Sequence, residues 1–129
     1  MRNAFIDHIT IEVGDFEASR RFYEAALAPF GLNVKDWRNP DNGKPEAEFG
    51  PPGSEDFAIT PGVPGTPLHI AFAATDRETV NSFHAAALGA GGRDNGPPGP
   101  RPKYSARYYA AFVFDPDGNN VEAVFHEPE

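Results

Sequence analysis

The chain has 129 residues, of which 40% are hydrophobic, and it carries a formal net charge of -8. This length suits one compact domain, and the negative charge argues against nucleic acid and against a lipid surface as partners. Because the sequence contains no cysteine, disulfide bonds and thiolate metal sites are excluded. No apolar run approaches the length of a membrane span, about 20 residues, and nothing resembles a signal peptide, so we expect a cytoplasmic protein.

The first half of the chain predicts a strand, a helix and three further strands. Residues 5–13 alternate between apolar and polar side chains, as in a half-buried strand. Asp15 is a suitable N-cap for the helix that follows, and Gly31 can end that helix in a left-handed conformation. The three further strands are expected near 32–37, 46–50 and 56–60.

The second half repeats this order. A strand is expected around residues 68–74, followed by an N-cap at Asp76 and a helix that ends at Gly89 or at Gly91-Gly92. Three strands are then expected near 92–95, 107–114 and 119–126. Because proline cannot donate a hydrogen bond to a central ladder, the segments 51–53, 61–67 and 96–102 are predicted to be turns or loops.

The two halves are related by an internal repeat. A shift of 61 residues aligns His8 with His69, and it also aligns the Asp15/Asp76 and Gly31/Gly92 pairs. Such a period indicates one supersecondary unit written twice. We therefore predict an α+β fold of two βαβββ modules, about 1–60 and 68–129, joined by residues 61–67. They would form a concave mixed sheet with the helices outside.

Strand alternation places three possible metal ligands on the inner face of this sheet. The apolar residues next to His8 and His69 should pack under the helices, which turns both imidazoles inward. In the last strand, Glu122 alternates with apolar neighbours, and a buried carboxylate needs a partner or a metal. Two histidines and one carboxylate suit Fe(II), Mn(II), Ni(II), Co(II) or Zn(II) and leave positions open for substrate.

Three segments of the chain carry a resemblance to a known superfamily. They are Asp7-His8-Ile9-Thr10, Leu68-His69-Ile70-Ala71 and Asp115-Pro116-Asp117-Gly118-Asn119-Asn120-Val121-Glu122. Together they resemble the vicinal oxygen chelate superfamily, which includes glyoxalase I, extradiol dioxygenases, fosfomycin resistance enzymes and bleomycin-binding proteins. The resemblance implies that His8, His69 and Glu122 are metal ligands. Glyoxalase I has a fourth, carboxylate ligand on the last strand of its first module, whereas this chain has Phe57-Ala58-Ile59-Thr60 there.

Further side chains are candidates for catalysis and for substrate binding. Tyr108 or Tyr109 could handle protons, although the sequence does not decide which of them faces inward. Lys103, Tyr104 and Arg107 follow the loop expected at 96–102 and form a cationic, aromatic patch. We expect this patch to orient an anionic or aromatic substrate.

Two functions of different classes are compatible with these residues. The first is a divalent-metal enzyme, either extradiol dioxygenase-like or lyase/isomerase-like. Its small substrate would chelate the metal through two vicinal oxygens. The alternative is a metal-free protein of the bleomycin-resistance type that sequesters a small molecule. We expect a homodimer, because exposed sheet edges invite pairing, and the metal site could lie within one chain or between two.

Overall fold

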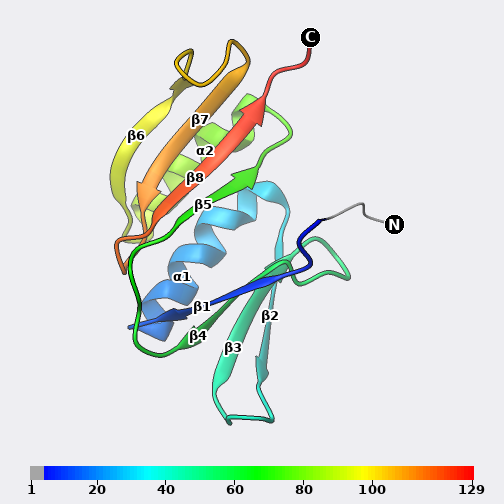
Figure 1. Cartoon of the computed structure of the whole chain (residues 1–129), viewed down its shortest axis with the longest axis vertical. Coiled ribbons are helices and arrows are strands. Elements are labelled where there is room, and N and C mark those ends of the chain that lie inside the picture. Colours follow the sequence, from blue (N-terminus) through cyan, green and yellow to red (C-terminus); the bar gives the residue numbers. More distant parts are fainter. Residues whose placement is uncertain (1–4) are drawn as a thin grey trace.

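The computed structural model describes residues 5–129 as two modules of the same element order (Figure 1). The first module contains β1 (Ile9–Val13), α1 (Phe16–Leu27), the short 3-10 helix η1 (Ala28–Phe30), β2 (Asn33–Arg38), β3 (Pro45–Gly50) and β4 (Phe57–Pro61). The second contains β5 (His69–Ala73), α2 (Arg77–Gly89), β6 (Arg93–Pro100), β7 (Tyr108–Phe114) and β8 (Asn120–His126). The predicted α+β fold of two βαβββ modules is confirmed.

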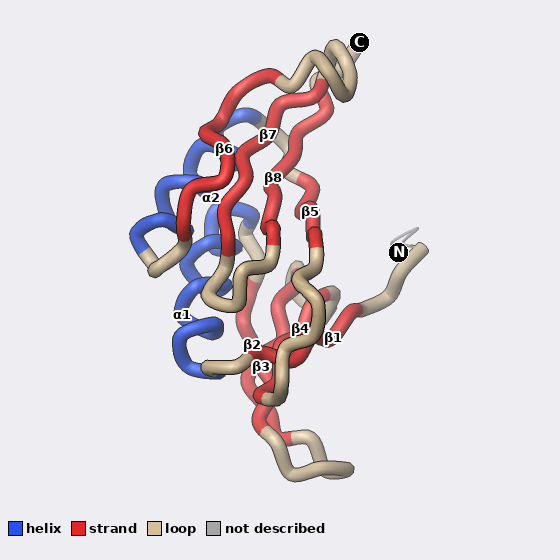
Figure 2. Tube along the Cα trace, turned by 60° about the vertical axis from the view of Figure 1, so that its left-hand side comes forward, coloured by secondary structure: helices blue, strands red, loops and turns tan. Residues whose placement is uncertain are grey.

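Each module forms its own four-stranded mixed sheet. The strand orders are β1-β4-β3-β2 and β5-β8-β7-β6, with β1 parallel to β4 and β5 parallel to β8. The expected single concave sheet is thus two separate sheets, with β1 and β5 each at an edge. The modules are joined instead through α1 and α2, which contact each other on one side of the sheets (Figure 2).

One hydrophobic core lies between the helices and the two sheets. Its largest buried side chains come from both modules and include Phe22, Phe49 and Phe83. Aromatic rings also pack across the boundary, since the ring centroid of Phe57 lies 5.4 Å from that of Phe72. The two modules therefore share one core. Edge-to-face aromatic pairs add to the stabilisation that comes from burying apolar area.

The helix ends follow the predicted chemistry. The carboxylate of Asp15 accepts a hydrogen bond from the backbone N–H of Ala18 at the start of α1, and Asp76 accepts one from Thr79 at the start of α2. Gly31 has a φ of 76°, the left-handed conformation expected after the first helix. Neither helix within residues 5–129 is long and apolar enough to cross a bilayer.

The segment 96–102 differs from its prediction as a loop, because β6 continues through it to Pro100. Gly96 pairs with Phe112 and Gly99 with Ala110, although the register shifts between these pairs. Since β6 is the edge strand of its sheet, prolines can occupy it without removing a central hydrogen bond. Proline is thus unfavourable in a central strand but not in an edge strand.

A buried carboxylate connects three parts of the fold. Asp115, in the turn between β7 and β8, accepts a hydrogen bond from the hydroxyl of Tyr23 on α1 at 2.5 Å. It also accepts hydrogen bonds from the backbone N–H and the side-chain amide of Asn119. The side-chain oxygen of Asn119 in turn accepts from the backbone N–H of Leu68, immediately before β5. This network ties α1 to the starts of β5 and β8.

We predict that Gly92→Ala destabilises the protein. A Cβ at Gly92 would lie 2.6 Å from a methyl of Val113 and 2.7 Å from the ring of Phe22, so the core must shift to admit it. We expect thermal or denaturant unfolding to show a loss of about 1–3 kcal/mol. Gly89→Ala is the matched control, because a Cβ there meets nothing within 4 Å. Equal stability of the two variants would contradict this account of the packing.

Removal of one hydroxyl should also weaken the network at Asp115. Tyr23 is fully buried, and both its burial and the neighbouring Asp115 raise the pKa of its phenol well above the ordinary value. Tyr23→Phe keeps the ring but removes a donor to this carboxylate, a loss of about 1.5–3 kcal/mol. Tyr109→Phe removes a hydrogen bond to the neutral Asn81 and should cost about 1 kcal/mol. Denaturant unfolding of both variants measures these losses of unfolding free energy. A larger loss in Tyr109→Phe than in Tyr23→Phe would refute the assigned role of Asp115.

Candidate functional site

The centre of the candidate site is a histidine-carboxylate pair on adjacent parallel strands. His69 begins β5, and Glu122 lies in the middle of β8. The Nε2 atom of His69 is 2.7 Å from the Oε1 atom of Glu122. The Glu122 side chain is only 1% exposed, whereas that of His69 is 55% exposed. A nearly buried carboxylate is therefore presented beside an accessible imidazole.

Tyr108 on β7 completes the surroundings of this carboxylate. Its hydroxyl donates a hydrogen bond to Oε2 of Glu122, so both carboxylate oxygens have polar partners. Burial, together with the hydrogen bond to Glu122, raises the pKa of Tyr108 to about 12. The phenol consequently keeps its proton at neutral pH and acts as a donor.

Tyr109 does not belong to this site. Because neighbouring residues of a strand face opposite sides, its hydroxyl lies under α2 and donates to Asn81 at 2.7 Å. The guanidinium of Arg77 lies over its ring, 4.5 Å from the centroid. Of the two tyrosines considered from the sequence, the structure places only Tyr108 beside Glu122.

His8 stands apart from the pair in the single chain. It precedes β1, is exposed, and its Nδ1 atom lies 2.8 Å from Oδ1 of Asp7. This hydrogen bond raises the pKa of His8, and the charge of Glu48 adds to the effect. Among residues 5–129, no group of three or more His, Asp or Glu side chains is arranged to hold a metal ion. The chain thus brings together His69 and Glu122 but not His8.

The face of the first module that carries His8 has a carboxylate that the sequence reasoning missed. Along β4, Ala58 and Thr60 pair with β1, so the strand that provides the fourth ligand in glyoxalase I offers no carboxylate there. Glu48 on β3 pairs with Ala58 and shares this face, and burial raises the pKa of its carboxyl group. The alternation of Glu48 with the buried Phe49 was the available signal.

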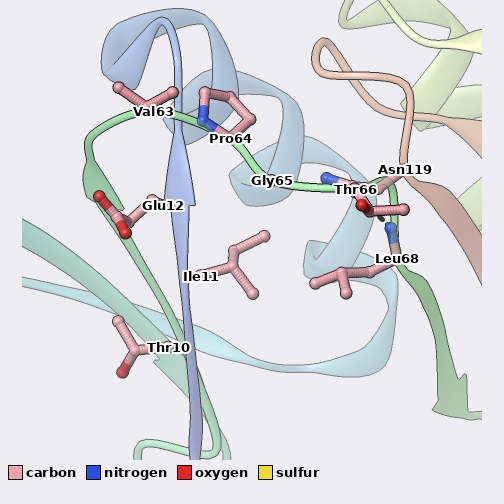
Figure 3. A pocket seen from close by; sticks show the side chains of 9 residues that line it. All are labelled: Thr10, Ile11, Glu12, Val63, Pro64, Gly65, Thr66, Leu68 and Asn119. Atoms are coloured by element: carbon pink, nitrogen blue, oxygen red, sulfur yellow. Dashed lines mark hydrogen bonds between the residues drawn. The ribbon is translucent and has the colours of Figure 1, made fainter.

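A cavity of about 470 Å³ lies between β1 and the segment that links the modules (Figure 3). Thr10 and Glu12 line it from β1, and Val63 and Leu68 line it from the link. A Cβ at Gly62 would meet the carboxylate of Glu12, so a larger residue at this position would have to displace that exposed side chain. Neither His69 nor Glu122 lines this cavity.

A smaller cavity, of about 210 Å³, is lined in part by Phe112, whose ring centroid lies 6.3 Å from that of His69. Lys103 and Tyr104, which the sequence predicts as substrate-binding residues, line it together with Arg101, which sequence reasoning overlooked. Arg107 is not among the lining residues and instead forms an ion pair with Glu129 at 3.3 Å. The signal for Arg101 was its position directly after the Pro-Gly-Pro run, next to the cationic residues already noted.

Comparison with solved structures places the fold among glyoxalase-like proteins. A glyoxalase/bleomycin resistance protein from Albidiferax ferrireducens is 30% identical, with 96% of this chain and 100% of that chain covered and a TM-score of 0.77. A glyoxalase I variant from Zea mays is 26% identical over 92% of this chain and 45% of that chain, with a TM-score of 0.68. The fosfomycin resistance protein FosX from Listeria monocytogenes, in a mutant form complexed with Mn(II) and dihydroxypropylphosphonic acid, is 20% identical. That match covers 100% of this chain and 95% of that chain, with a TM-score of 0.65, and shows a shared fold alone.

A comparison with curated proteins finds no significant match. The model of one protein family, by contrast, matches residues 5–123, nearly the whole length. This match agrees with the resemblance noted from the histidine segments and the terminal motif. The chain belongs to the Glyoxalase/Bleomycin resistance protein/Dioxygenase superfamily.

Proposed function

We propose that this protein is a divalent-metal-dependent enzyme whose site is completed between two copies of the chain. The observation that carries the proposal is the 2.7 Å contact between His69 and Glu122, two ordinary metal-ligand types on an open sheet face. Two protein donors are too few for a typical catalytic site, which has three. We assign the third position to His8 of a second copy, because His8 of the same chain stands apart.

The surface around the unpaired sheet edges supports a homodimer. Within the described residues, β1 and β5 are edge strands, and such edges favour association. Large exposed apolar side chains gather in or beside these strands and the link between the modules: Phe5, Ile6, Ile9, Val63 and Leu68. In a twofold-symmetric dimer each copy would bring its His8 to the pair of the other, which yields two equivalent sites.

The donor set determines the chemistry that we propose. His69, Glu122 and His8 of the partner subunit would hold a divalent ion, which would supply a Lewis acid for two vicinal oxygens of a small substrate. Tyr108 holds Oε2 of Glu122 and thereby orients Oε1 toward His69. Tyr108 also carries an exchangeable proton beside the pair, so we assign proton handling to it.

The residues on β4 bear on the class of substrate. Without a carboxylate at Ala58 or Thr60, the β4 side lacks the residue that glyoxalase I uses as its fourth ligand. We therefore favour a catechol, vicinal diol or hydroxy-ketone over a glutathione hemithioacetal. The metal dependence draws support from the complex of FosX with Mn(II), whose fold this chain shares.

Loss of one imidazole should empty the metal site. In His69→Ala, one proposed metal ligand and the partner of Glu122 Oε1 disappear, and we expect metal affinity to fall about 10-fold to 100-fold. Elemental analysis or titration calorimetry of purified protein measures this change. His84→Ala is the matched control, because His84 pairs with Asp94 away from the site. Equal metal in His69→Ala and the parent would refute the assignment.

A heterodimer tests whether the site is shared between copies. Chains with His8→Ala and with His69→Ala, each with a different affinity tag, are co-expressed and the mixed dimer is purified. By symmetry it would contain one intact site and one doubly defective site, hence about half of the parental metal, whereas either homodimer would be largely empty. A mixed dimer as empty as the homodimers would contradict a site formed between chains.

A substrate screen separates the reactions and the rival function. The Fe(II), Mn(II), Ni(II) and Zn(II) forms are assayed with catechols in the presence of oxygen and with hemithioacetals in its absence. We expect turnover of the first class and little of the second. Strong turnover of hemithioacetals would contradict the argument from β4. Failure of every metal form, combined with tight binding of a small molecule, would favour a sequestering protein of the bleomycin-resistance type.

A further inference from the structure

We propose that the small cavity beside the metal site binds an oxyanion, so that the substrate carries a carboxylate or a phosphate-type group apart from its chelating oxygens. This inference rests on the proposed function in one respect, namely that the bound anion is part of the enzyme's substrate. The cavity of about 210 Å³ is lined by Asn95, Gly96, Arg101 and Lys103, among others. It is smaller than the about 300–1,000 Å³ of ordinary ligand pockets, so it suits one small group of a molecule.

The cavity lies on the same sheet face as the histidine-carboxylate pair. Phe112, which lines it, is directly opposite Glu122 in the β7–β8 ladder, and its ring centroid is 6.3 Å from that of His69. Asn120, another lining residue, precedes Glu122 by two positions and pairs with His69 across β5 and β8. A molecule bound at Glu122 and His69 would reach the cavity by extending past the ring of Phe112.

The charge of the cavity is opposite to that of the protein. The chain has a net charge of -8. Yet within the part of the chain that the structure describes, neither Arg101 nor Lys103 has a carboxylate within 4.0 Å. By contrast, Arg20, Arg77 and Arg107 each form an ion pair. Two uncompensated cations at one small cavity favour an anionic ligand, which an acidic protein would otherwise repel.

The guanidinium of Arg101 is held in place before any ligand arrives. It donates hydrogen bonds to the backbone carbonyls of Pro97, Gly99 and Pro100, which orient the group without neutralising it. The group also lies over the Phe112 ring, 5.3 Å from the centroid. A cation fixed in this way loses little conformational entropy when it binds an oxyanion.

The glycine at the wall of the cavity permits this arrangement. Gly96 has a φ of 153°, and a Cβ there would lie 3.1 Å from the Phe112 ring and 3.2 Å from Nη2 of Arg101. Any larger residue would press against the guanidinium. Besides forming the edge of the sheet, the end of β6 that is rich in glycine and proline thus positions Arg101 through its carbonyls and through Gly96.

The test uses NMR titration of the full metal-free chain at constant ionic strength. The probes are inorganic phosphate and acetate, with acetamide as the neutral analogue of acetate. We expect one or both anions to produce saturable shifts of the Gly96 and Lys103 backbone amides, whereas acetamide produces none. The stronger of the two anions identifies the phosphate-type or carboxylate class of group.

Charge variants decide whether the cavity is responsible. Lys103→Gln should weaken anion binding by about tenfold, the effect of losing one charge-assisted hydrogen bond. Arg21→Gln, the same charge change at an exposed position on α1, should leave it unchanged. Lys103 makes a ring contact with Tyr104 and can be replaced without disturbing the carbonyls that Arg101 holds. Arg101→Gln should weaken binding further, and Lys103→Gln remains decisive if that variant misfolds.

The outcomes separate this inference from the metal function. Equal weakening by Arg21→Gln, or equal shifts with acetamide, would overturn the cavity as an oxyanion site. Metal retained in the parent with no anion-dependent shifts would overturn this inference alone. Anion binding that depends on Lys103 in a protein that never takes up metal would support the cavity and refute the metal enzyme.

Discussion

The geometry of the site depends on one buried carboxylate at some distance from it. Asp115 is 3% exposed and needs its hydrogen-bond donors, because an unpaired buried charge is costly. Those donors come from Tyr23 on α1 and from Asn119, which also receives the N–H of Leu68. His69 follows Leu68 directly, and β8 begins directly after Asn119. The network therefore sets the register in which His69 and Glu122 meet.

The same strands carry residues of the core and residues of the site. Strand alternation places the core residues on one face of the sheet and the site residues on the other. On β8, Val121 and Ala123 are fully buried on the helix side, while Glu122 faces the opposite side. On β7, Tyr109 joins the core and Tyr108 contacts Glu122. A slip of one residue would exchange these faces, so packing of the core enforces the placement of the polar site.

Much of this organisation could be predicted from the sequence. The predictions used sequence patterns: the repeat at His8 and His69, the caps at Asp15 and Asp76, and the alternation around Glu122. These patterns correctly predicted the two modules and the face of the last strand on which Glu122 lies. Element order, helix ends and strand faces follow from local periodicity and capping chemistry, which the residues themselves carry. Family membership followed from the same segments.

Only the tertiary structure decided how these pieces meet. Alternation shows which face a residue occupies but not which sheets share an edge, so the sequence could not reveal that His8 stands apart from His69 and Glu122. Likewise, the choice of Tyr108 over Tyr109 required the strand register. The position of Arg101 depends on long-range contact between an edge strand and Phe112, which no local pattern encodes. The sequence determined the modules and the strand faces that carry the candidate residues, whereas packing between distant segments determined which of these side chains converge.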